Sequence, residues 1–286
     1  MPERILVTGA TGKLGSEIVR MLHAKGETIR AATRFPTRAE TLFGGAVEVV
    51  EMDYQATETW DNAVQWVDRL FLMPPPFDPH AFDTLAPFLD WAVASGTHKV
   101  VLLSAMAIDR EPGLALIRLE RHLQELDIAA TVLRPNLYMQ NLSSGFIHDS
   151  IRDHGIIEVG ASDGRVSFVD ATDVAEVAVL ALTTRSLDAD TVTLTGPDSF
   201  GFADVARRIS EAAGKPVRYS PATNQRMREV LRAAHMTDAA ADVGIGLFAA
   251  IEQGEREPVH SDVPDILGRP ARTFIDFVAA NAAIWR

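Results

Sequence analysis

Three glycines at three-residue intervals are the first residues of this chain whose type and spacing could serve chemistry. Gly9, Gly12 and Gly15 lie in the stretch ILVTGATGKLG. A glycine has no Cβ, so it can take a positive φ and let a ligand approach the main chain. Where such a turn opens a helix, the unpaired N–H groups favour an anion. The stretch therefore predicts a site for the pyrophosphate of a dinucleotide.

The glycine spacing alone is a weak signal, because G-x-x-G-x-x-G departs from the more usual G-x-G-x-x-G. The alternative is a glycine-rich turn that binds no ligand. The context favours the nucleotide site, since an apolar run suited to a buried strand precedes the glycines and apolar residues at helical spacing follow them. These are Ile5–Val7 before the turn and Leu14, Ile18, Met21 and Leu22 after it.

Alternating strand and helix patterns continue along the first half of the chain. We expect strands at Thr28–Thr33, Ala46–Met52, Arg69–Met73, Val100–Leu103 and Ala130–Leu133. Helical stretches separate them near 38–43 and 58–65, before a long helix that ends at 95–96, and at an apolar stripe from 116 to 126. This alternation predicts an α/β fold with a Rossmann-type, doubly wound parallel sheet.

The pattern changes after Pro135. Residues 136–164 read as irregular with short helical pieces, and further elements are expected at 165–169, 173–182, 191–194, 202–213, 226–253 and 273–282. We expect residues 1–135 to form the dinucleotide-binding core. Residues 136–286 should form a smaller, mostly helical substrate region, interleaved with that core in a single compact unit.

Composition excludes several other functions. A formal charge of −12 disfavours binding to nucleic acid or an anionic membrane. The absence of cysteine excludes disulfides and thiol chemistry, and the eight histidines lack metal-binding spacing, so no metal site is expected. No apolar run approaches the roughly 20 residues of a membrane span. The charged N-terminus leads directly into a strand, so the cytoplasm is the expected compartment.

Two arginines suggest which dinucleotide is bound. Arg34 follows the second strand, where NAD enzymes usually place an acidic residue and NADP enzymes an arginine for the 2′-phosphate. A guanidinium can pair a phosphate through two hydrogen bonds, and Arg38 could assist from the next helix. The alternative is two solvated surface arginines. We favour NADP(H) as the cofactor.

Six segments occur in an order and spacing that is specific as a set. They are TGATGKLG at Thr8–Gly15, FLMPPP at Phe71–Pro76, VVLLSA at Val100–Ala105, TVLRPNLYMQN at Thr131–Asn141, FVDATDVAEVAVLAL at Phe168–Leu182 and GRPARTFIDFVAAN near the end. Through these segments the chain resembles the NmrA-like, atypical short-chain dehydrogenases/reductases, which include bacterial quinone and dye reductases and fungal clavine reductases. The resemblance implies a Rossmann core with a small C-terminal substrate region.

The resemblance also implies particular cofactor contacts. In the glycine segment these are Gly9, Thr11, Gly12, Lys13, Leu14 and Gly15. Asp53 matches the acidic position that bonds the adenine amine in the family, although an Asp that caps the next helix is an equal alternative. Pro74 and Pro75 would form a rigid wall beside the nicotinamide ribose, or they simply end the fourth strand.

The usual catalytic residues of related dehydrogenases are only partly present. Ser104 ends the fifth strand at the place of their catalytic serine, and it is a candidate catalytic or cofactor-contacting residue. Aligning Glu120 with the acidic residue that trails their Tyr-x-x-x-Lys motif puts Pro112 at the tyrosine and Leu116 at the lysine. Neither can relay a proton. Quinones, iminium ions and cationic dyes, which need less protein acid, are therefore favoured over simple carbonyls.

Tyr138 follows the sixth strand, at the sheet edge where α/β proteins bind ligands. Its hydroxyl could donate a proton to the substrate, but we favour a pocket-lining role for the ring. Asn141 matches an Asn that recurs in the family, and we expect it to tie this loop down. Seven residues could surround an apolar cleft or belong to the core: Met73, Phe77, Met106, Tyr138, Met139, Phe146 and Phe168.

Two functions follow from these observations. The favoured one is an NAD(P)H-dependent oxidoreductase that passes hydride to a small apolar, cyclic or aromatic acceptor such as a quinone, an imine or iminium ion, or a dye. The alternative is a non-catalytic NADP(H) sensor like the NmrA-type regulators. The expected partner is a small-molecule substrate, with no nucleic acid or membrane, and the chain would be a monomer or a homodimer.

Overall fold

The structure is a computed structural model that describes residues 3–108 and 113–286. Its chain forms two compact units. The first comprises Met1–Pro75, His80–Arg134 and Val174–Val192, and the second Pro76–Pro79, Pro135–Asp173 and Thr193–Arg286. The main boundary thus falls between Arg134 and Pro135, next to the expected one, and Val174–Val192 returns to the first unit.

The first unit is built on a sheet with the strand order β3-β2-β1-β4-β5-β6-β9. Each registered pair within it, from β3–β2 through to β5–β6, is parallel. This order extends the 3-2-1-4-5-6 arrangement of dinucleotide-binding folds and confirms the predicted doubly wound sheet. The strands are β1 Arg4–Val7, β2 Thr28–Thr33, β3 Glu48–Glu51, β4 Arg69–Leu72, β5 Lys99–Leu103, β6 Ala129–Pro135 and β9 Thr191–Leu194.

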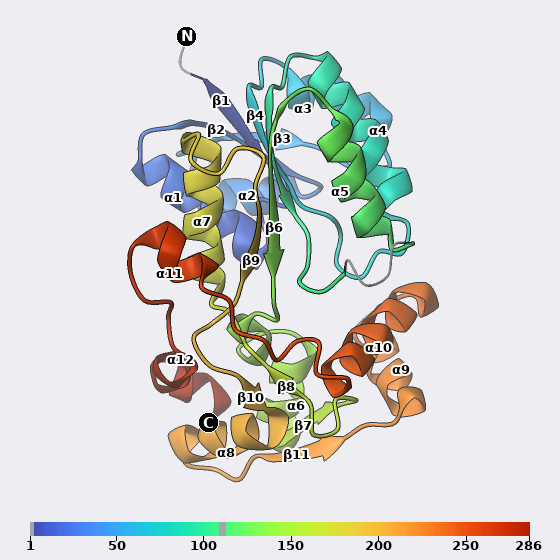
Figure 1. Cartoon of the computed structure of the whole chain (residues 1–286), viewed down its shortest axis with the longest axis vertical. Helices are drawn as coiled ribbons and strands as arrows, with labels where there is room; N and C mark the ends of the chain where they lie inside the picture. Colours follow the sequence, from blue (N-terminus) through green and yellow to red (C-terminus); the bar gives the residue numbers. More distant parts are fainter. Residues whose placement is uncertain (1–2, 109–112) are drawn as a thin grey trace. The chain divides into compact units, whose positions relative to one another are not determined.

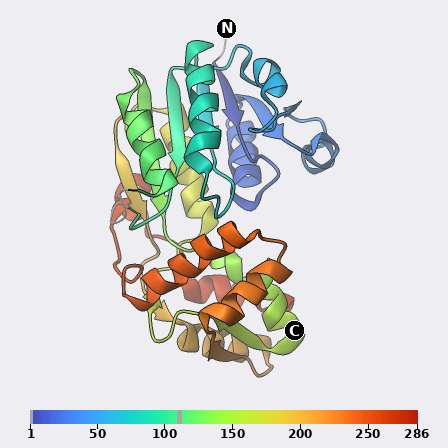
Figure 2. The ribbon, with the colours of Figure 1, turned by 90° about the vertical axis from the view of Figure 1, so that its right-hand side faces the viewer.

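Helices cover both faces of this sheet, so its central strands are buried and apolar on either side. Figure 1 shows α3, α4 and α5 on one face and α1 and α7 on the other. Figure 2 shows α4 and α5 lying side by side. The elements are α1 Lys13–Ala24, α2 Pro36–Phe43, η1 Thr57–Thr59, α3 Trp60–Val64, α4 Ala81–Ala94, α5 Ala115–Glu125 and α7 Ala171–Thr183.

Two of these helices show how the sequence sets their position. In α1, Leu14, Ile18 and Leu22 recur at helical spacing and are buried, as expected. In α5 the buried side chains are Ile117, Leu119, Glu120 and Leu123, whereas Leu116 is only half-buried. The predicted stripe was therefore slightly misplaced, and a glutamate takes part in the buried face.

Cations at the amino ends of two strands hold the C-terminal end of α7. Arg69 Nη1 donates to the Leu182 carbonyl at 2.9 Å. Lys99 Nζ donates to the Thr184 carbonyl and pairs with Asp188 at 2.5 Å. A positive charge is favourable at a helix C-terminus, where the last carbonyls lack partners. Because Lys99 is 5% exposed, these contacts are internal to the first unit.

The second unit contains short helices and two small two-stranded sheets. β8 pairs antiparallel with β10, and β7 pairs parallel with β11. Figure 2 shows α9 and α10 side by side. The elements are η2 Met139–Leu142, α6 Phe146–His154, β7 Ile156–Val159, β8 Arg165–Val166, β10 Phe200–Gly201, α8 Phe202–Ala213, β11 Arg218–Pro221, α9 Asn224–Ala233, α10 Asp238–Glu252, α11 Asp262–Leu267, α12 Phe274–Asn281 and η3 Ala282–Trp285.

Aromatic rings form the core of the second unit. Phe168 stacks on Phe274 with 5.5 Å between ring centroids and meets Phe202 edge-on at 5.8 Å. Trp285 is fully buried and its Nε1 donates to the Leu142 carbonyl at 2.7 Å. Phe168 and Met139, two of the residues expected around an apolar cleft, are thus ordinary core residues, being 2% and 0% exposed.

A buried carboxylate joins two of the segments that carry the family resemblance. Asp173 is fully buried and accepts hydrogen bonds from the Arg272 backbone N–H at 2.8 Å and from Arg269 Nη2 at 2.7 Å. The Arg272 guanidinium also pairs with it. These contacts fix the loop before α12 to the start of α7.

The strand pattern of the second unit was predicted less well than that of the first. The β7–β11 pair was not expected, because each strand meets its partner only through a contact distant in sequence. The strand expected at 165–169 stops at Val166, since Ser167 then bonds elsewhere: its N–H donates to the Arg256 carbonyl at 3.0 Å and its hydroxyl to the Pro258 carbonyl at 2.8 Å. Within the described ranges, no helix is long and apolar enough to cross a membrane.

Candidate functional site

The glycine turn between β1 and α1 is shaped by close packing. Gly9 has a φ of +62°, and a Cβ there would lie 1.9 Å from Met73 Cε. A Cβ on Gly15 would lie 2.2 Å from the Gly9 carbonyl oxygen, which no adjustment of a side chain could relieve. Gly12 is less crowded, with 3.2 Å to the same oxygen. Gly9 and Gly15 are therefore required by the fold itself, and Gly12 is the glycine with room beside it.

A threonine holds the turn against the neighbouring strand. Thr8 Oγ1 donates to the Phe71 carbonyl at 2.9 Å and accepts from the Met73 N–H at 2.9 Å. The turn leads into α1, whose N-cap is Gly12, and among the described residues no side chain caps this helix end. Its first N–H groups and its dipole therefore favour an anion at the carboxyl edge of the sheet.

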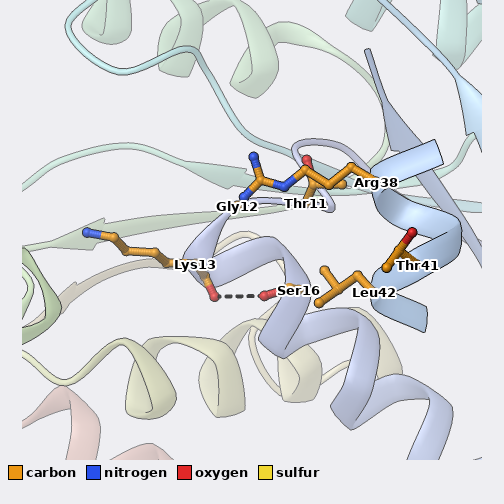
Figure 3. A pocket seen from close by; sticks show the side chains of 7 residues that line it. All are labelled: Thr11, Gly12, Lys13, Ser16, Arg38, Thr41 and Leu42. Carbon is orange, nitrogen blue, oxygen red and sulfur yellow. Dashed lines mark hydrogen bonds between the residues drawn. The ribbon is translucent and has the colours of Figure 1, made fainter. Parts of the chain in front are cut away.

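A cavity of about 610 Å³ opens beside this turn. It is lined from α1 and its turn by Thr11, Gly12, Lys13 and Ser16, and from α2 by Arg38, Thr41 and Leu42. Figure 3 shows the Arg38 side chain extending over the cavity toward Gly12, while Lys13 extends the other way. Desolvation lowers the pKa of the Lys13 ammonium below its ordinary value. Two cations thus flank an exposed main chain in a molecule of net charge −12.

Of the two arginines predicted to bind the 2′-phosphate of NADP(H), only one lines the cavity. Arg38 lines the cavity, whereas Arg34 does not belong to its lining. The exposed Arg34 guanidinium lies over the Phe35 ring, 5.6 Å from its centroid. The position after the second strand favours Arg34, and its contact with the cofactor stays a prediction. Thr41 and Leu42 were not predicted, since a cavity wall supplied by the neighbouring helix α2 has no local sequence signal. Ser16, on α1 itself, was also not predicted.

Asp53 accepts a hydrogen bond through its side chain from the main chain two residues further on, within a local turn. Its Oδ1 accepts from the Gln55 N–H at 3.0 Å, and its carbonyl accepts from Trp60 Nε1 at 3.0 Å. The alternative in which Asp53 caps the next helix is not realised, because the N-cap of η1 is Ala56 and that of α3 is Thr59. The half-buried carboxylate is held rigidly just past β3, and its contact with adenine stays a prediction.

The proline pair follows β4 closely. The strand ends at Leu72, and the Met73 carbonyl accepts from the buried Tyr54 hydroxyl at 3.0 Å. Burial raises the pKa of Tyr54 above its ordinary value. Pro74 is half-buried and Pro75 is exposed. The role of the prolines beside a nicotinamide ribose stays a prediction.

Ser104 belongs to a buried polar group made from three successive elements. Its hydroxyl, at the end of β5, donates to Glu120 Oε1 on α5. Arg134, in β6, donates to both oxygens of the same carboxylate, from Nε at 3.1 Å and from Nη2 at 2.6 Å. Ser104 and Glu120 are 7% and 2% exposed. Leu116, at the position of the usual lysine, is half-buried on α5, and Pro112 lies outside the described residues.

Tyr138 lies at the start of the loop after β6. Its main chain forms a bridge with Val169, and its hydroxyl is buried without a hydrogen-bond partner among the described residues. Burial raises the pKa of the phenol above its ordinary value of about 10. The side chain that ties this loop to α7 is that of Gln140, which accepts from the Ala171 N–H at 2.9 Å. The expected role of Asn141 in holding this loop stays a prediction.

Of the described residues, none of the predicted site residues takes part in a metal site or lines a further cavity in the second unit. In the part of the chain that the structure describes, no group of three His, Asp or Glu side chains could hold a metal ion. A cavity of about 650 Å³ in the second unit is lined by residues that include Pro197, His260, Pro264, Arg269 and Pro270.

The model of the NmrA-like family matches residues 1–243, and the chain belongs to this family. An NAD(P)H azoreductase from Xenophilus azovorans is 31% identical over 283 residues, covering 98% of both chains. An agroclavine dehydrogenase from Claviceps purpurea is 30% identical and covers 99% of this chain and 98% of its own. The triphenylmethane reductase of Citrobacter sp., solved with NADP(H), shares the fold with a TM-score of 0.82 at 24% identity, covering 98% of this chain and 99% of its own.

Proposed function

We propose that this chain is an NAD(P)H-dependent oxidoreductase that transfers hydride to a small apolar, cyclic or aromatic acceptor. The observation that carries the proposal is the glycine turn with its uncapped helix end, opening on a cavity into which Arg38 extends. The names of two relatives, an NAD(P)H azoreductase and an agroclavine dehydrogenase, support it, since both are names of redox enzymes.

The residues of the cavity fit NADP(H). The N–H groups at Gly12 and the start of α1 would hold the pyrophosphate, and Arg38 would pair the 2′-phosphate. The expected contact of Arg34 with that phosphate stays a prediction. When bound, the reduced cofactor supplies the hydride. The protein contributes orientation and a water-poor environment, which together can lower a barrier substantially without any side-chain acid.

The favoured acceptor class follows from two positions considered for a proton donor. Leu116 has no ionisable group, and burial raises the pKa of Tyr138, which makes its phenol a weak acid. A quinone, an imine or iminium ion, or a conjugated dye accepts hydride at a position that is already electron-poor. Such acceptors should therefore be reduced faster than simple ketones.

Steady-state oxidation of NADPH tests the proposal, measured with a panel of quinones, imines, azo compounds and triphenylmethane dyes. We expect turnover with at least one of these classes and little with simple ketones. Turnover of a ketone as fast as the best cationic acceptor would contradict the assignment of chemistry.

The second candidate is a non-catalytic NADP(H) sensor, and the half-buried Leu116 at the lysine position is the observation in its favour. NADPH binding without oxidation by any acceptor would support this alternative. The assignment of substrate binding to residues 136–286, the cytoplasmic location and the monomeric or homodimeric state stay predictions.

A further inference from the structure

In the buried group of Ser104, Glu120 and Arg134, the Ser104 hydroxyl proton has an assigned acceptor. A serine hydroxyl has one proton and two lone pairs, and an arginine has donors only. The Ser104 proton goes to Glu120 Oε1, which also accepts from Arg134 Nε, while Oε2 accepts from Arg134 Nη2. Both oxygens of the carboxylate therefore act as acceptors in this group. Ser104 Oγ can therefore offer a ligand only its lone pairs.

Turning the serine proton toward a ligand would be unfavourable. Glu120 is 2% exposed, so water cannot replace a donor that leaves its carboxylate. A hydrogen bond to a buried charged group is among the strong ones, and losing it leaves the full desolvation penalty of that group. The main chain adds to the constraint, since the Ser104 N–H donates to the Leu133 carbonyl at 2.7 Å and fixes the end of β5.

We propose that Glu120, held by Arg134, is a positioning residue that fixes Ser104 as a hydrogen-bond acceptor, so that the carboxyl end of β5 selects ligands that present an N–H or O–H donor. The inference rests on the proposed function, because it takes this edge of the sheet as the place where cofactor and substrate bind. It gives Ser104 the opposite direction of hydrogen bonding from a serine that protonates or polarises a carbonyl oxygen.

Two ligand groups have this chemistry. One is the carboxamide N–H of the nicotinamide, and the other is a hydroxyl or amine on the substrate or product. The 3-acetylpyridine analogue of NADP⁺ replaces the carboxamide with an acetyl group and so removes the N–H. The pair 1-naphthol and 1-methoxynaphthalene differs in one O–H on an aromatic ring system. Each pair tests one source.

The experiment measures dissociation constants by calorimetry for wild type, Ser104→Ala and Ser104→Thr. The first arm compares NADP⁺ with its acetylpyridine analogue, and the second compares the two naphthalenes at saturating NADP⁺. We expect wild type to prefer the donor-bearing member by about tenfold in one arm, as a single hydrogen bond allows. Ser104→Ala should lose this preference and Ser104→Thr, which keeps the hydroxyl, should retain it.

Glu120→Gln tests the positioning role. The amide can donate its own N–H to Ser104, which frees the serine proton, so we expect the preference to fall to about twofold or less. Thr131→Val is the matched control, because it removes another buried hydroxyl of the same sheet, one that donates to the Leu187 carbonyl at 2.7 Å. It should leave both preferences unchanged. If Glu120→Gln does not fold, the Ser104 variants still decide the question.

An equal preference in wild type and Ser104→Ala in both arms would overturn the proposal. So would a loss of about 100-fold or more in kcat for a quinone in Ser104→Ala with neither preference changed, because that size of effect is typical of a proton donor. Failure of wild type to bind NADP⁺ would instead contradict the proposed function itself.

Discussion

At the carboxyl ends of its strands the first unit leaves a helix N-terminus open, whereas at their amino ends it closes a helix C-terminus with its own charges. The N-terminus of α1 follows Gly12 and, in the described part of the chain, receives no side-chain cap. The C-terminus of α7 receives Arg69 and Lys99, both from strands of the sheet. Both helix ends carry partial charge of the same size and opposite sign.

This difference shows how the two edges of one sheet can have different roles, the carboxyl edge in ligand binding and the amino edge in stability. An uncapped positive end at a glycine turn leaves part of its interaction energy to be completed by an external anion. A negative end whose carbonyls accept from cations of the sheet contributes to folding and is not available to a ligand. Substitutions at the carboxyl edge should therefore change binding, and substitutions at the amino edge should change stability.

Gly12→Val should have the largest effect on binding. A Cβ at Gly12 would lie 3.2 Å from the Gly9 oxygen, and the rest of the valine would stand where the pyrophosphate must approach the main chain. We expect circular dichroism close to wild type and no calorimetric signal with NADPH. Gly246→Val, at a position with no atom within 4 Å of an added Cβ, is the control. Retained NADPH binding would mean that the turn is only structural.

Lys99→Met should lower the stability of the fold and leave NADPH binding unchanged. Removing one partner of a buried pair typically destabilises by about 3–5 kcal/mol, and since the Asp188 side chain is 27% exposed we expect about 3 kcal/mol from urea unfolding. The dissociation constant for NADPH should stay close to wild type. Arg207→Met removes an exposed pair with Glu211 and should change the free energy of unfolding much less than Lys99→Met does. A Lys99→Met protein that is as stable as wild type but binds NADPH poorly would contradict the claim that the amino edge of the sheet serves stability and not binding.

Arg38→Ala should weaken NADPH binding by roughly 10- to 100-fold and leave NADH nearly unaffected, because a charge-assisted contact is worth about 1.5–3 kcal/mol. Arg34→Ala is the matched comparison, since its guanidinium rests over Phe35 and does not line the cavity. Its effect should be the smaller of the two. If titration gives Arg34→Ala the larger loss, the position after β2 matters more than the cavity wall.

Tyr138→Phe should have the smallest effect, a few-fold change in kcat. The hydroxyl is buried and its pKa is raised, so it stays protonated at any ordinary assay pH. Wild type and Tyr138→Phe should therefore show the same dependence of rate on pH. Removing an unpaired buried hydroxyl should leave the free energy of unfolding unchanged or raise it by about 1 kcal/mol. A loss of about 100-fold or more would identify Tyr138 as the proton donor.

The fold of the first unit was predictable because its signals are local. The strands at Thr28–Thr33 and Thr191–Leu194 have the predicted bounds. In the second unit, the helix at Phe202–Ala213 does as well. The glycine turn could be read in the same way, since a turn and the helix that follows it are contiguous in sequence. The family resemblance was likewise confirmed by the match over residues 1–243.

What could not be predicted depends on contacts between distant residues. The sequence shows both FVDATDV and GRPART, but only the fold brings Asp173 to Arg269 and Arg272. It shows Ser104 without revealing that Glu120 accepts a hydrogen bond from its hydroxyl. It also places Arg38 on a helix without revealing that this helix lines the cavity beside Gly12. Each of these facts requires the distance between elements, which periodicity does not contain.

The return of Val174–Val192 to the first unit has a consequence for how the protein is made. When residue 134 leaves the ribosome, Arg69 and Lys99 are already synthesised, but their acceptors at Leu182, Thr184 and Asp188 are not. At about 5–20 residues per second the nascent chain waits several seconds for them. During that interval its incomplete sheet has an uncovered edge, and Arg69 and Lys99 lack these acceptors. A truncated gene that stops at the apparent boundary should yield an aggregation-prone fragment, and the shortest self-sufficient nucleotide-binding product must extend past Val192.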